Sequence, residues 1–490
     1  MATPTTARGD VSRATSSPAR AVVSPVAKLQ EFLESERVTE KRGPEAFAEF
    51  ERRLHERMME IERDVVGTEM ARLDVADDAV VIEGKTHRRV LRQSQTYMTC
   101  AGPVVVERNL YKDRSDSEGK CVSPMELTLG AVGGFWTPRA AQQALWVVTQ
   151  MTPGKSAELF ERMGNMTPSK SSLDRLPKVI SERWEKDREK LEEALREGLK
   201  VPEGAVSIAV SVDGVFAPME DSDVTQRRAE AAEDGRIMKG PLGFREVGCA
   251  TISFCDKDGE LLGAIRMARS PEHKKLTLKA MLAAEVEAIL RARPDLRLIK
   301  IADAVVDNWT FLSGALPPGK ELIDFFHAGE HIHGAIADVY GDATLETQYR
   351  STKLIEALRD EDDGVETVIR AFKYLATKHP RRLKITRALK YFRVNRQRMR
   401  YAEMKASGFP IGSGVVEAAC KTVVTQRLKL SGMRWSAGGA QAILTPRGWD
   451  QSERFDQAWA LVAATFHSEV TVLANVVALR PKRADKRTSR

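Results

Sequence analysis

Two aspartates close apolar segments of the chain. Asp213 stands at the end of AVSIAVSVDG (205–214) and Asp303 at the end of LRLIKIAD (296–303). Short apolar segments of this kind predict strands, and strand ends lie at the rim of an open α/β sheet, where ligands bind. If the two strands are neighbours, the carboxylates repel each other unless a cation lies between them. Oxygen ligands in such a place suit Mg²⁺ or Mn²⁺, although each aspartate alone could simply begin a turn.

A third carboxylate comes from a different element. In FPIGSGVVEAACKTVV (409–424) the turn Gly412–Gly414 precedes a helix that carries Glu417 in its first turns, with Ser413 at the N-cap position. The separations along the chain are 303 − 213 = 90 and 417 − 303 = 114 residues. Glu417 could supply the third ligand of a metal site, or it could only complement the dipole of its helix.

The elements that must position these carboxylates alternate between strand and helix. After the first strand, which ends at Asp213, REVGCATISFCD and GELLGAIRMA form a predicted hairpin with DKDG as its turn. A helix over HKKLTLKAMLAAEVEAILRAR, the strand ending at Asp303, a helix starting near Asn308 and a strand over ELIDFFH follow. This order predicts an α/β fold and is the order of the ribonuclease H fold.

A helical segment with a basic run separates the last strand from the helix of Glu417. Residues 328–405 are predicted to be wholly helical, and RRLKITRALKYFRVNRQRMR (381–400) holds nine Lys or Arg residues and no acidic residue. Such a run favours contact with phosphates, with Tyr391 stacking on an unpaired base. The alternative is a solvated helix face.

The N-terminal part is predicted to be mainly helical. Residues 27–64 have helical periodicity and dense charge, and VVIEG and GPVVVER predict short strands. Three segments that each begin with Thr-Pro, at positions 137, 152 and 167, predict helices with proline in the first turn. They are either a helix-turn-helix array that binds DNA or ordinary helical packing. A charged helix over Leu176–Leu199 would link them to the next domain.

Composition restricts the class of protein. The 490 residues carry a net charge of +7, with 76 Lys and Arg against 69 Asp and Glu, which is compatible with a polyanionic partner without requiring one. The five cysteines form no C-x-x-C pair, so we expect neither a disulfide framework nor a cysteine-rich zinc site. No apolar run is long enough to span a membrane. We therefore expect a cytoplasmic protein with no membrane partner, which would have access to DNA if the host is a bacterium.

Four ordered motifs resemble a known family. VSVDGVFAPM (210–219), IADAVVDNWTFL (301–312), DFFHAGEHI (324–332) and GFPIGSGVVEAACKTVVTQRLKLSGMRWS (408–436) look like the bacterial insertion-sequence DDE transposases of the Kra group, which are related to the Mutator superfamily. The resemblance runs from about Val206 to Leu461. It implies a ribonuclease H-like catalytic core interrupted by an all-helical insertion, and a metal-dependent transposase that cleaves the ends of an insertion sequence and joins them to target DNA.

The resemblance assigns roles to individual residues. Asp213, Asp303 and Glu417 match the three catalytic acids that hold Mg²⁺ or Mn²⁺. Asp324 and His327 match the family's motif of a carboxylate or Cys, two residues and His. We expect His327 either to touch the scissile phosphate or to steady a metal-binding carboxylate through a hydrogen bond. A zinc site made of His327, His331 and His333 is not expected, since His333 lies on another helix face.

The expected mechanism is an in-line displacement with two metal ions. Asp213 and Asp303 would bridge the ion that activates water, and Asp213 and Glu417 would hold the ion that stabilises the leaving 3′ oxygen. The freed 3′-hydroxyl then attacks the target DNA. Pairing of two element ends implies a homodimer or higher oligomer at synapsis. A nuclease of the same fold without strand transfer, and a catalytically inactive DNA-binding derivative, are the alternatives.

Contacts to DNA are expected from three basic regions. The residues that we predict to touch nucleic acid are Tyr391, Arg393, Arg396, Arg398, Arg400, Arg427, Lys429, Arg434 and Trp435. The last four follow the third acid and could guide the cleaved end. The C-terminal segment PKRADKRTSR (481–490) is a basic tail that would bind DNA without sequence preference.

These expectations divide the chain into seven parts. They are a disordered tail (1–26), a region of helices and short strands (27–135), a helical region with the candidate helix-turn-helix and linker (136–200), the first part of the core (201–327), the helical insertion (328–405), the second part of the core (406–462), and a C-terminal helix with the basic tail (463–490). Pro446 and Gly448 predict a break in the helix that follows Gly439.

Overall fold

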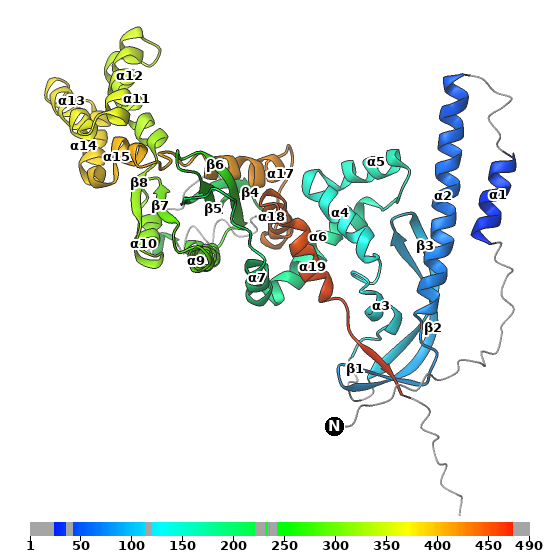
Figure 1. Ribbon diagram of the computed structural model, residues 1–490. Helices are drawn as coiled ribbons and strands as arrows, with labels where there is room; N and C mark the ends of the chain where they lie inside the picture. The colour runs from blue at the N-terminus through cyan, green and yellow to red at the C-terminus, as the bar shows by residue number, and fades with distance from the viewer. Residues whose placement is uncertain are drawn as a thin grey trace, which may run out of the picture. The chain divides into compact units, whose positions relative to one another are not determined.

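The computed structural model describes residues 24–35, 43–113, 115, 119–220, 231–233, 235 and 243–473. The fold is mixed α/β, with two separate sheets (Figure 1). It divides into two compact units. The first comprises Met1–Met125, Phe160–Thr167 and Val470–Arg490, and the second comprises Glu126–Leu159 and Pro168–Glu469. The predicted basic tail (481–490) and the predicted disordered tail, up to residue 23, lie outside the described residues.

The first unit combines two helices with a four-stranded sheet. The helices are α1 (Pro25–Ser35) and α2 (Pro44–Arg72), so residues 25 and 26 belong to a helix and not to the predicted tail. The antiparallel sheet has the order β3-β2-β1-β9, from β1 (Ala79–Ile82), β2 (Lys85–Thr99), β3 (Gly102–Asp113) and β9 (Val470–Val472). The strands predicted at VVIEG and GPVVVER are confirmed. Of the C-terminal helix predicted within 463–490, the described part instead contains β9, which pairs with β1, and residues 474–490 lie outside the described residues.

Helices of the second unit precede its sheet. They are α4 (Pro138–Gln150), α6 (Lys170–Lys186) and α7 (Arg188–Glu197), together with most of α3 (Pro124–Leu129) and α5 (Pro153–Met163), whose residues 124–125 and 160–163 belong to the first unit. Proline begins α4 and α5 as predicted, but α6 begins after Ser169, whose hydroxyl accepts a hydrogen bond from Ser172 N. The single charged helix predicted over 176–199 is wrong, because the chain leaves helical geometry at Asp187. α4 and α6 pack against α18 (Ala437–Gln451), in the same compact unit as the sheet.

The five-stranded sheet has the order β6-β5-β4-β7-β8. Its strands are β4 (Ser207–Pro218), β5 (Phe244–Cys255), β6 (Leu261–Arg269), β7 (Arg297–Ala302) and β8 (Lys320–Ile323). β4, β5 and β6 pair antiparallel, whereas β7 pairs parallel with both β4 and β8. Together with η2 (His273–Lys275), α9 (Leu276–Ala292) and α10 (Val306–Ala315), they confirm the predicted order of strands and helices.

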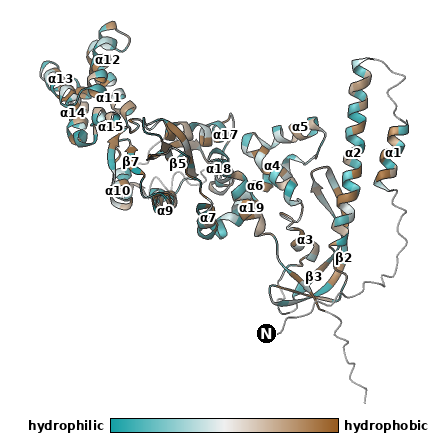
Figure 2. Cartoon of the chain, in the orientation of Figure 1, coloured by the Kyte–Doolittle hydropathy of each residue, from teal (hydrophilic) through white to brown (hydrophobic). Residues whose placement is uncertain are grey.

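Both faces of this sheet are covered by apolar contacts. Gly248 of β5 faces α9, because a Cβ there would lie 2.8 Å from Leu278, while the adjacent Cys249 lies beside Cys420 on the opposite face. Val210, Ile252 and Ile299 are fully buried in the strands. Figure 2 shows hydrophobic residues concentrated in this sheet. A sheet buried on both faces is a rigid support for side chains at its edge.

The insertion predicted over 328–405 is helical throughout. Its elements are α11 (Phe325–Tyr340), α12 (Leu345–Asp360), α13 (Gly364–Lys378), α14 (Leu383–Asn395), η3 (Arg396–Arg398) and α15 (Tyr401–Ala406). The strand predicted over ELIDFFH is wrong beyond Ile323, because Asp324 caps α11 and His327 lies in the first turn of that helix.

The last part of the second unit is helical. It consists of α16 (Gly414–Ala419), the π-helical turn η4 (Cys420–Thr425), α17 (Gln426–Leu428), α18 and α19 (Phe455–Ala464). The break predicted at Pro446 and Gly448 is wrong, since α18 runs through both residues. Gly448 allows a close backbone approach, because a Cβ there would lie 3.2 Å from Arg266 O. Within the described ranges, no helix has both the length and the apolar character to cross a membrane.

Candidate active site

The register of the parallel strands aligns three aspartates. β7 pairs with β4 at a constant offset, 297 − 207 = 90, and the same offset relates Asp303 to Asp213. β8 pairs with β7 at an offset of 323 − 302 = 21, which relates Asp324 to Asp303. Continued past the last paired residues, these offsets assign Asp213, Asp303 and Asp324 to the same level of the sheet, with Asp213 on β4 and the other two just beyond β7 and β8.

Asp213 is not at the end of its strand, which corrects the sequence prediction. β4 continues to Pro218 because its pairing with β5 continues, with Asp213 opposite Cys249 and Pro218 opposite Phe244. The parallel pairing with β7 ends at Val210 and Lys300. Asp213 thus lies three residues beyond the last pair between β4 and β7, where no described strand pairs with this side of β4.

Asp213 and Asp303 line one open groove of about 740 Å³. Asp303 is held by the start of α10, since its Oδ1 accepts hydrogen bonds from Asn308 Nδ2 at 3.0 Å and from Val305 N at 3.3 Å. Trp309 Nε1 donates to the backbone oxygen of Asp303 at 2.6 Å. These bonds fix one carboxylate oxygen of Asp303, and its Oδ2 has no hydrogen-bond partner among the described residues.

Glu417 belongs to the same cluster of negative charge. It is exposed on α16, and partial desolvation, followed by the carboxylates of Asp324 and Asp213, raises its pKa, while His327 lowers it. Glu417 is therefore within electrostatic reach of Asp213. Asp213 is thus related to both other acids. It is in register with Asp303, and its charge raises the pKa of Glu417.

Asp324 is fully buried and connects two elements of the site. Its Oδ1 accepts a hydrogen bond from His327 N at 2.9 Å, and its Oδ2 accepts one from Ser413 N. Gly412 fits this turn because a Cβ there would lie 2.7 Å from the ring of Phe326. Asp324 therefore contacts the backbone of His327, and no hydrogen bond joins it to the imidazole ring among the described residues. Instead it ties the start of α11 to the turn that begins the helix of Glu417.

His327 lies in the first turn of α11, with 41% of its side chain exposed. Its Nδ1 is 3.3 Å from Glu330 Oε2, and no hydrogen bond joins its ring to the three acids among the described residues. His331 stacks on Tyr391 with ring centroids 3.9 Å apart, and His333 faces Asp342. Of the three histidines, His327 is the one whose charge affects Glu417.

Two thiols that the sequence interpretation set aside lie beside Asp213. Cys420 Sγ is 3.7 Å from Asp213 Oδ2, and Cys249 is the partner of Asp213 across β5. A hydrogen bond with Cys249, and then burial, raise the pKa of Cys420. Cys420 follows Glu417 by three residues, which is the spacing of neighbours on a helix. That spacing could have identified Cys420 from the sequence, whereas nothing local identified Cys249.

The wall of the groove also contains an ion pair, between Lys275 and Glu246, that the sequence did not lead us to predict. Lys275 Nζ donates to Asp213 O at 3.3 Å and forms an ion pair with Glu246 at 2.9 Å. Lys274 and Lys275 both have left-handed backbone, with φ of 49° and 55°. Such conformations cost on the order of 1–3 kcal/mol each and cluster at functional sites. The cation of Lys275 is thereby held next to the strand that carries Asp213.

The acids fit a divalent cation in donor type and in charge. Asp213, Asp303 and Glu417 offer hard oxygen atoms. The pKa of Glu417 is raised first by desolvation and then by neighbouring carboxylates, whose negative charge a cation would neutralise. The acids do not form a ready-made ligand cluster, since no three His, Cys, Asp or Glu side chains within the described ranges are grouped to hold a metal ion.

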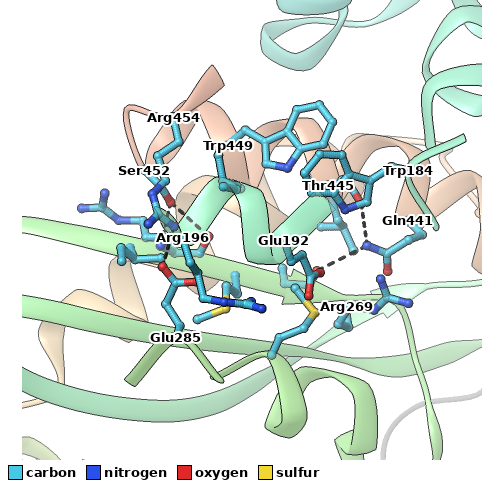
Figure 3. Close-up of a pocket in the computed structure, with 18 of the residues that line it drawn as sticks. Trp184, Glu192, Arg196, Arg269, Glu285, Gln441, Thr445, Trp449, Ser452 and Arg454 are labelled. Carbon is cyan, nitrogen blue, oxygen red and sulfur yellow. Dashed lines mark hydrogen bonds and ion pairs between the residues drawn. The ribbon is translucent and has the colours of Figure 1, made fainter. Parts of the chain in front are cut away.

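A second pocket lies elsewhere and contains none of these acids. It is bounded by α6, α7, β6 and α18, with Trp184, Trp449 and Glu192 in its wall (Figure 3). Burial raises the pKa of Glu192 to about 7, although Arg188 lies 3.6 Å away. One oxygen of Glu192 is buried and has no hydrogen-bond partner within the described part of the chain. Arginines line this pocket together with Glu192, and Asp213, Asp303 and Glu417 are not among its lining residues, so we do not place the predicted phosphodiester chemistry there.

The residues of the insertion that we predicted to contact DNA differ in their exposure and in their partners. Arg393 is exposed, and Arg396 and Arg400 lie at 3.9 and 3.5 Å from Glu366 and Glu403. Arg398 forms a 2.7 Å ion pair with Glu321 and covers the ring of Trp309, so it attaches the insertion to β8 and α10. Tyr391, which we expected to stack on a base, is stacked on His331.

The contacts predicted after the third acid also differ in exposure. Lys429 and Arg434 are exposed, and Trp435 is half-buried, with its Nε1 donating to Leu428 O at 3.0 Å. Arg427 is only 1% exposed, which corrects the expectation of a surface contact. The signal was present in the sequence, because Arg427 follows Val423 and Val424 and precedes Leu428 at the spacing of a buried helix face.

Comparison with known proteins adds no assignment. No protein-family model matches the chain, and a search of curated proteins finds no match.

Proposed function

We propose that this protein is a DDE-type transposase that cleaves DNA at the ends of an insertion sequence and joins them to target DNA. The observation that carries the proposal is the alignment of Asp213 and Asp303 at the same level in one groove, with Glu417 in electrostatic reach of Asp213. Phosphodiester cleavage with two metal ions needs carboxylates that hold both ions at one place.

The topology supports a ribonuclease H-like core for the second unit. Three antiparallel strands are followed by two parallel strands, in the order β6-β5-β4-β7-β8. The helical insertion enters between β8 and α16, and so separates the second acid from the third. Asp324 holds the two sides of the insertion together, because its carboxylate accepts hydrogen bonds from His327 N before the insertion and from Ser413 N after it.

The residues of the chain have distinct tasks in this proposal. Asp213, Asp303 and Glu417 would hold Mg²⁺, or Mn²⁺ in its place. When bound, these ions would supply activation of water and stabilisation of the leaving oxygen. Asn308 orients Asp303, Lys275 lies beside Asp213, and Asp324 positions the helix of Glu417. His327 is exposed near Glu417, where it could contact a phosphate.

A basic helix face provides a surface for DNA. Lys384, Arg387, Lys390 and Arg393 of α14 are exposed, and none has an ion-pair partner among the described residues. Unpaired cations on one helix face bind phosphates by releasing counterions. We propose DNA as the partner, with at least two copies of the chain brought together when two element ends are paired.

The test is incubation of the purified protein with labelled DNA from the flanks of its own gene and with a target plasmid. Mg²⁺, Mn²⁺ and EDTA are compared, together with Asp213→Asn and Glu417→Gln. We expect metal-dependent nicking at one position and joined products, both lost in the two variants while DNA binding remains.

The products separate the proposal from its alternatives. Nicking without joined products would identify a nuclease of the same fold. Binding to the flanking DNA without either product in any metal would identify an inactive derivative. Nicking that survives in Glu417→Gln would remove Glu417 from the site.

A further inference from the structure

Among the described residues, Arg427 is a buried cation that forms no ion pair within 4.0 Å, although the charge of Asp174 acts on it from farther away. It is 1% exposed, and its Nε has no hydrogen-bond partner in the part of the chain that the structure describes. Its nearest contacts are Met433 Sδ, 3.9 Å from Nη1, and the ring of Trp435, whose centroid is 5.4 Å from Cζ. Burial, and then the like charge of Arg447, lower its pKa to about 10. An unpaired buried charge is unfavourable, which calls for a reason.

Arg427 lines a pocket of the second unit that differs from the groove of the acids. This pocket has a volume of about 470 Å³. Its charged lining residues are Arg427, Arg434, Lys170, Lys178, Asp174 and Glu220. Asp174 is neutralised by Lys178 at 2.6 Å. The four cations exceed the two carboxylates, so the pocket carries a net charge of 4 − 2 = +2.

The starts of helices add positive potential to this pocket. Thr152, Pro153 and Gly154 line it at the start of α5, and Ser436 and Gly439 line it at the start of α18. The first turn of a helix presents the positive end of the helix dipole, although Gly439 N is already bonded to Ser436 Oγ and Lys155 N to Thr152 Oγ1. This is the arrangement in which proteins bind phosphate groups, and the buried guanidinium of Arg427 is a second, independent feature of the same site.

The pocket is joined to the strand of the first acid. Beyond β4, Met219 pairs with Trp435 in a parallel bridge, and Trp435 N donates to Pro218 O at 3.2 Å. Trp435 also lies over Arg427. A ligand held by Arg427 would therefore be fixed relative to β4, which carries Asp213.

We infer that this pocket binds a phosphate group of the DNA backbone, with Arg427 as its buried ligand and Arg434 and Lys170 at its rim. The inference rests on the proposed function, because it assigns the pocket to DNA held near the acids. Free inorganic phosphate shares the same chemistry, and the experiment distinguishes the two sources.

The first measurement is thermal unfolding of the wild type and of Arg427→Met, with and without inorganic phosphate. We expect Arg427→Met to unfold at a higher temperature than the wild type in phosphate-free buffer, because it removes an unpaired buried charge. We expect phosphate to raise the midpoint of the wild type in a saturable manner and to leave that of Arg427→Met unchanged. A lower midpoint of Arg427→Met without phosphate would show that Arg427 is only structural.

The second measurement is the affinity for a labelled DNA duplex at fixed salt concentration. Arg427→Met and Arg434→Met should each weaken binding by about tenfold, since each removes a charged hydrogen-bond donor. The matched control is Lys186→Met, an exposed cation at the other end of α6 that does not line the pocket. Its affinity should remain within about threefold of the wild type.

The outcomes are distinct from those that test catalysis. If phosphate protection is lost in Arg427→Met but DNA affinity is unchanged, the pocket holds free phosphate and the inference is wrong. If Asp213-dependent nicking occurs and both arginine variants bind DNA like the wild type, the inference fails while the proposed function stands. If the arginine variants lose DNA affinity but the wild type never nicks DNA, the pocket stands and the catalytic proposal fails.

Discussion

Asp324 and Arg427 are both buried and both charged, but they differ in how well hydrogen bonds satisfy their charged groups. Each carboxylate oxygen of Asp324 accepts a backbone N–H, so its charge is satisfied inside the protein. The guanidinium of Arg427 contacts a thioether and an aromatic ring, and its pKa is lowered by burial and then by Arg447, which Asp174 opposes without forming an ion pair. A satisfied buried charge holds structure together, whereas an unsatisfied one requires a ligand or reduces stability.

Asp324→Asn tests the positioning role of the buried carboxylate. Asparagine offers one oxygen and one NH₂ group, so either His327 N or Ser413 N would face a donor. We expect the free energy of unfolding, measured with urea, to fall by about 1–3 kcal/mol. We also expect faster amide hydrogen exchange over α16, with little change over β4 and β7, and reduced DNA nicking.

The control is Asp342→Asn, at a carboxylate that is 91% exposed. Its effect on the free energy of unfolding should remain within about 0.5 kcal/mol. Equal acceleration of exchange over the sheet and over α16 in Asp324→Asn would mean that Asp324 stabilises the whole unit without positioning Glu417.

At the scale of elements, the packing of α7 desolvates Glu192, and this makes the free energy of unfolding depend on pH. Glu192 of this helix is buried beside Arg188, and burial raises its pKa from 4.5 to about 7 (Figure 3). The folded protein therefore holds this proton more tightly than the unfolded chain. The contribution of Glu192 to stability is fully present below pH 4.5 and is lost as the pH rises through about 7.

Glu192→Gln should remove this dependence. Above pH 7 the variant is expected to be more stable than the wild type, by on the order of 3 kcal/mol, because glutamine carries no charge to be buried. Below pH 4.5 the two proteins should have the same stability. Urea unfolding across this pH range measures both, with the exposed Glu193→Gln as the control. A constant difference at every pH would contradict the raised pKa.

The basic face of α14 supplies the second prediction at this scale. Replacing Lys384, Arg387 and Lys390 with glutamine should weaken DNA binding and reduce the slope of log affinity against log salt by up to about 3. The control replaces three cations that form ion pairs with Glu346, Asp360 and Asp363, namely Arg350, Arg359 and Arg370. Both variants lose three charges, so an equal change in slope would show that net charge alone determines binding.

Some of these elements could be predicted from the sequence, and others could not. The strands before Asp213 and Asp303 were predictable, because local apolar runs mark a buried sheet. The continuation of β4 to Pro218 was not, because it depends on pairing with β5. Pro446 and Gly448 are locally unfavourable in a helix, yet packing of α18 against α4, α6 and β6 maintains the helix through both. Tertiary contacts outweigh local propensity in each of these cases.

At the scale of the whole molecule, the chain passes four times between its two units. The first unit takes residues from the start of the chain, from Phe160–Thr167 and from Val470–Arg490. β9 is three residues long and has no strong pattern of its own, so its pairing with β1 could not be predicted from local sequence. The chain beyond the candidate active site thus completes the sheet of the other unit.

Truncation after Glu469 tests this long-range contribution. It removes β9 and turns β1 into an edge strand, because the sheet has the order β3-β2-β1-β9. We expect amide hydrogen exchange over Ala79–Ile82 to accelerate by about tenfold or more, since inter-strand hydrogen bonds are lost. Exchange over β4 and β7 should not change. Truncation after Leu473, which keeps β9, is the matched control and should leave both sheets as they are. Unchanged exchange over Ala79–Ile82 in the shorter chain would show that β9 adds nothing to the first unit, and faster exchange over β4 would show that its effect extends to the sheet of the acids.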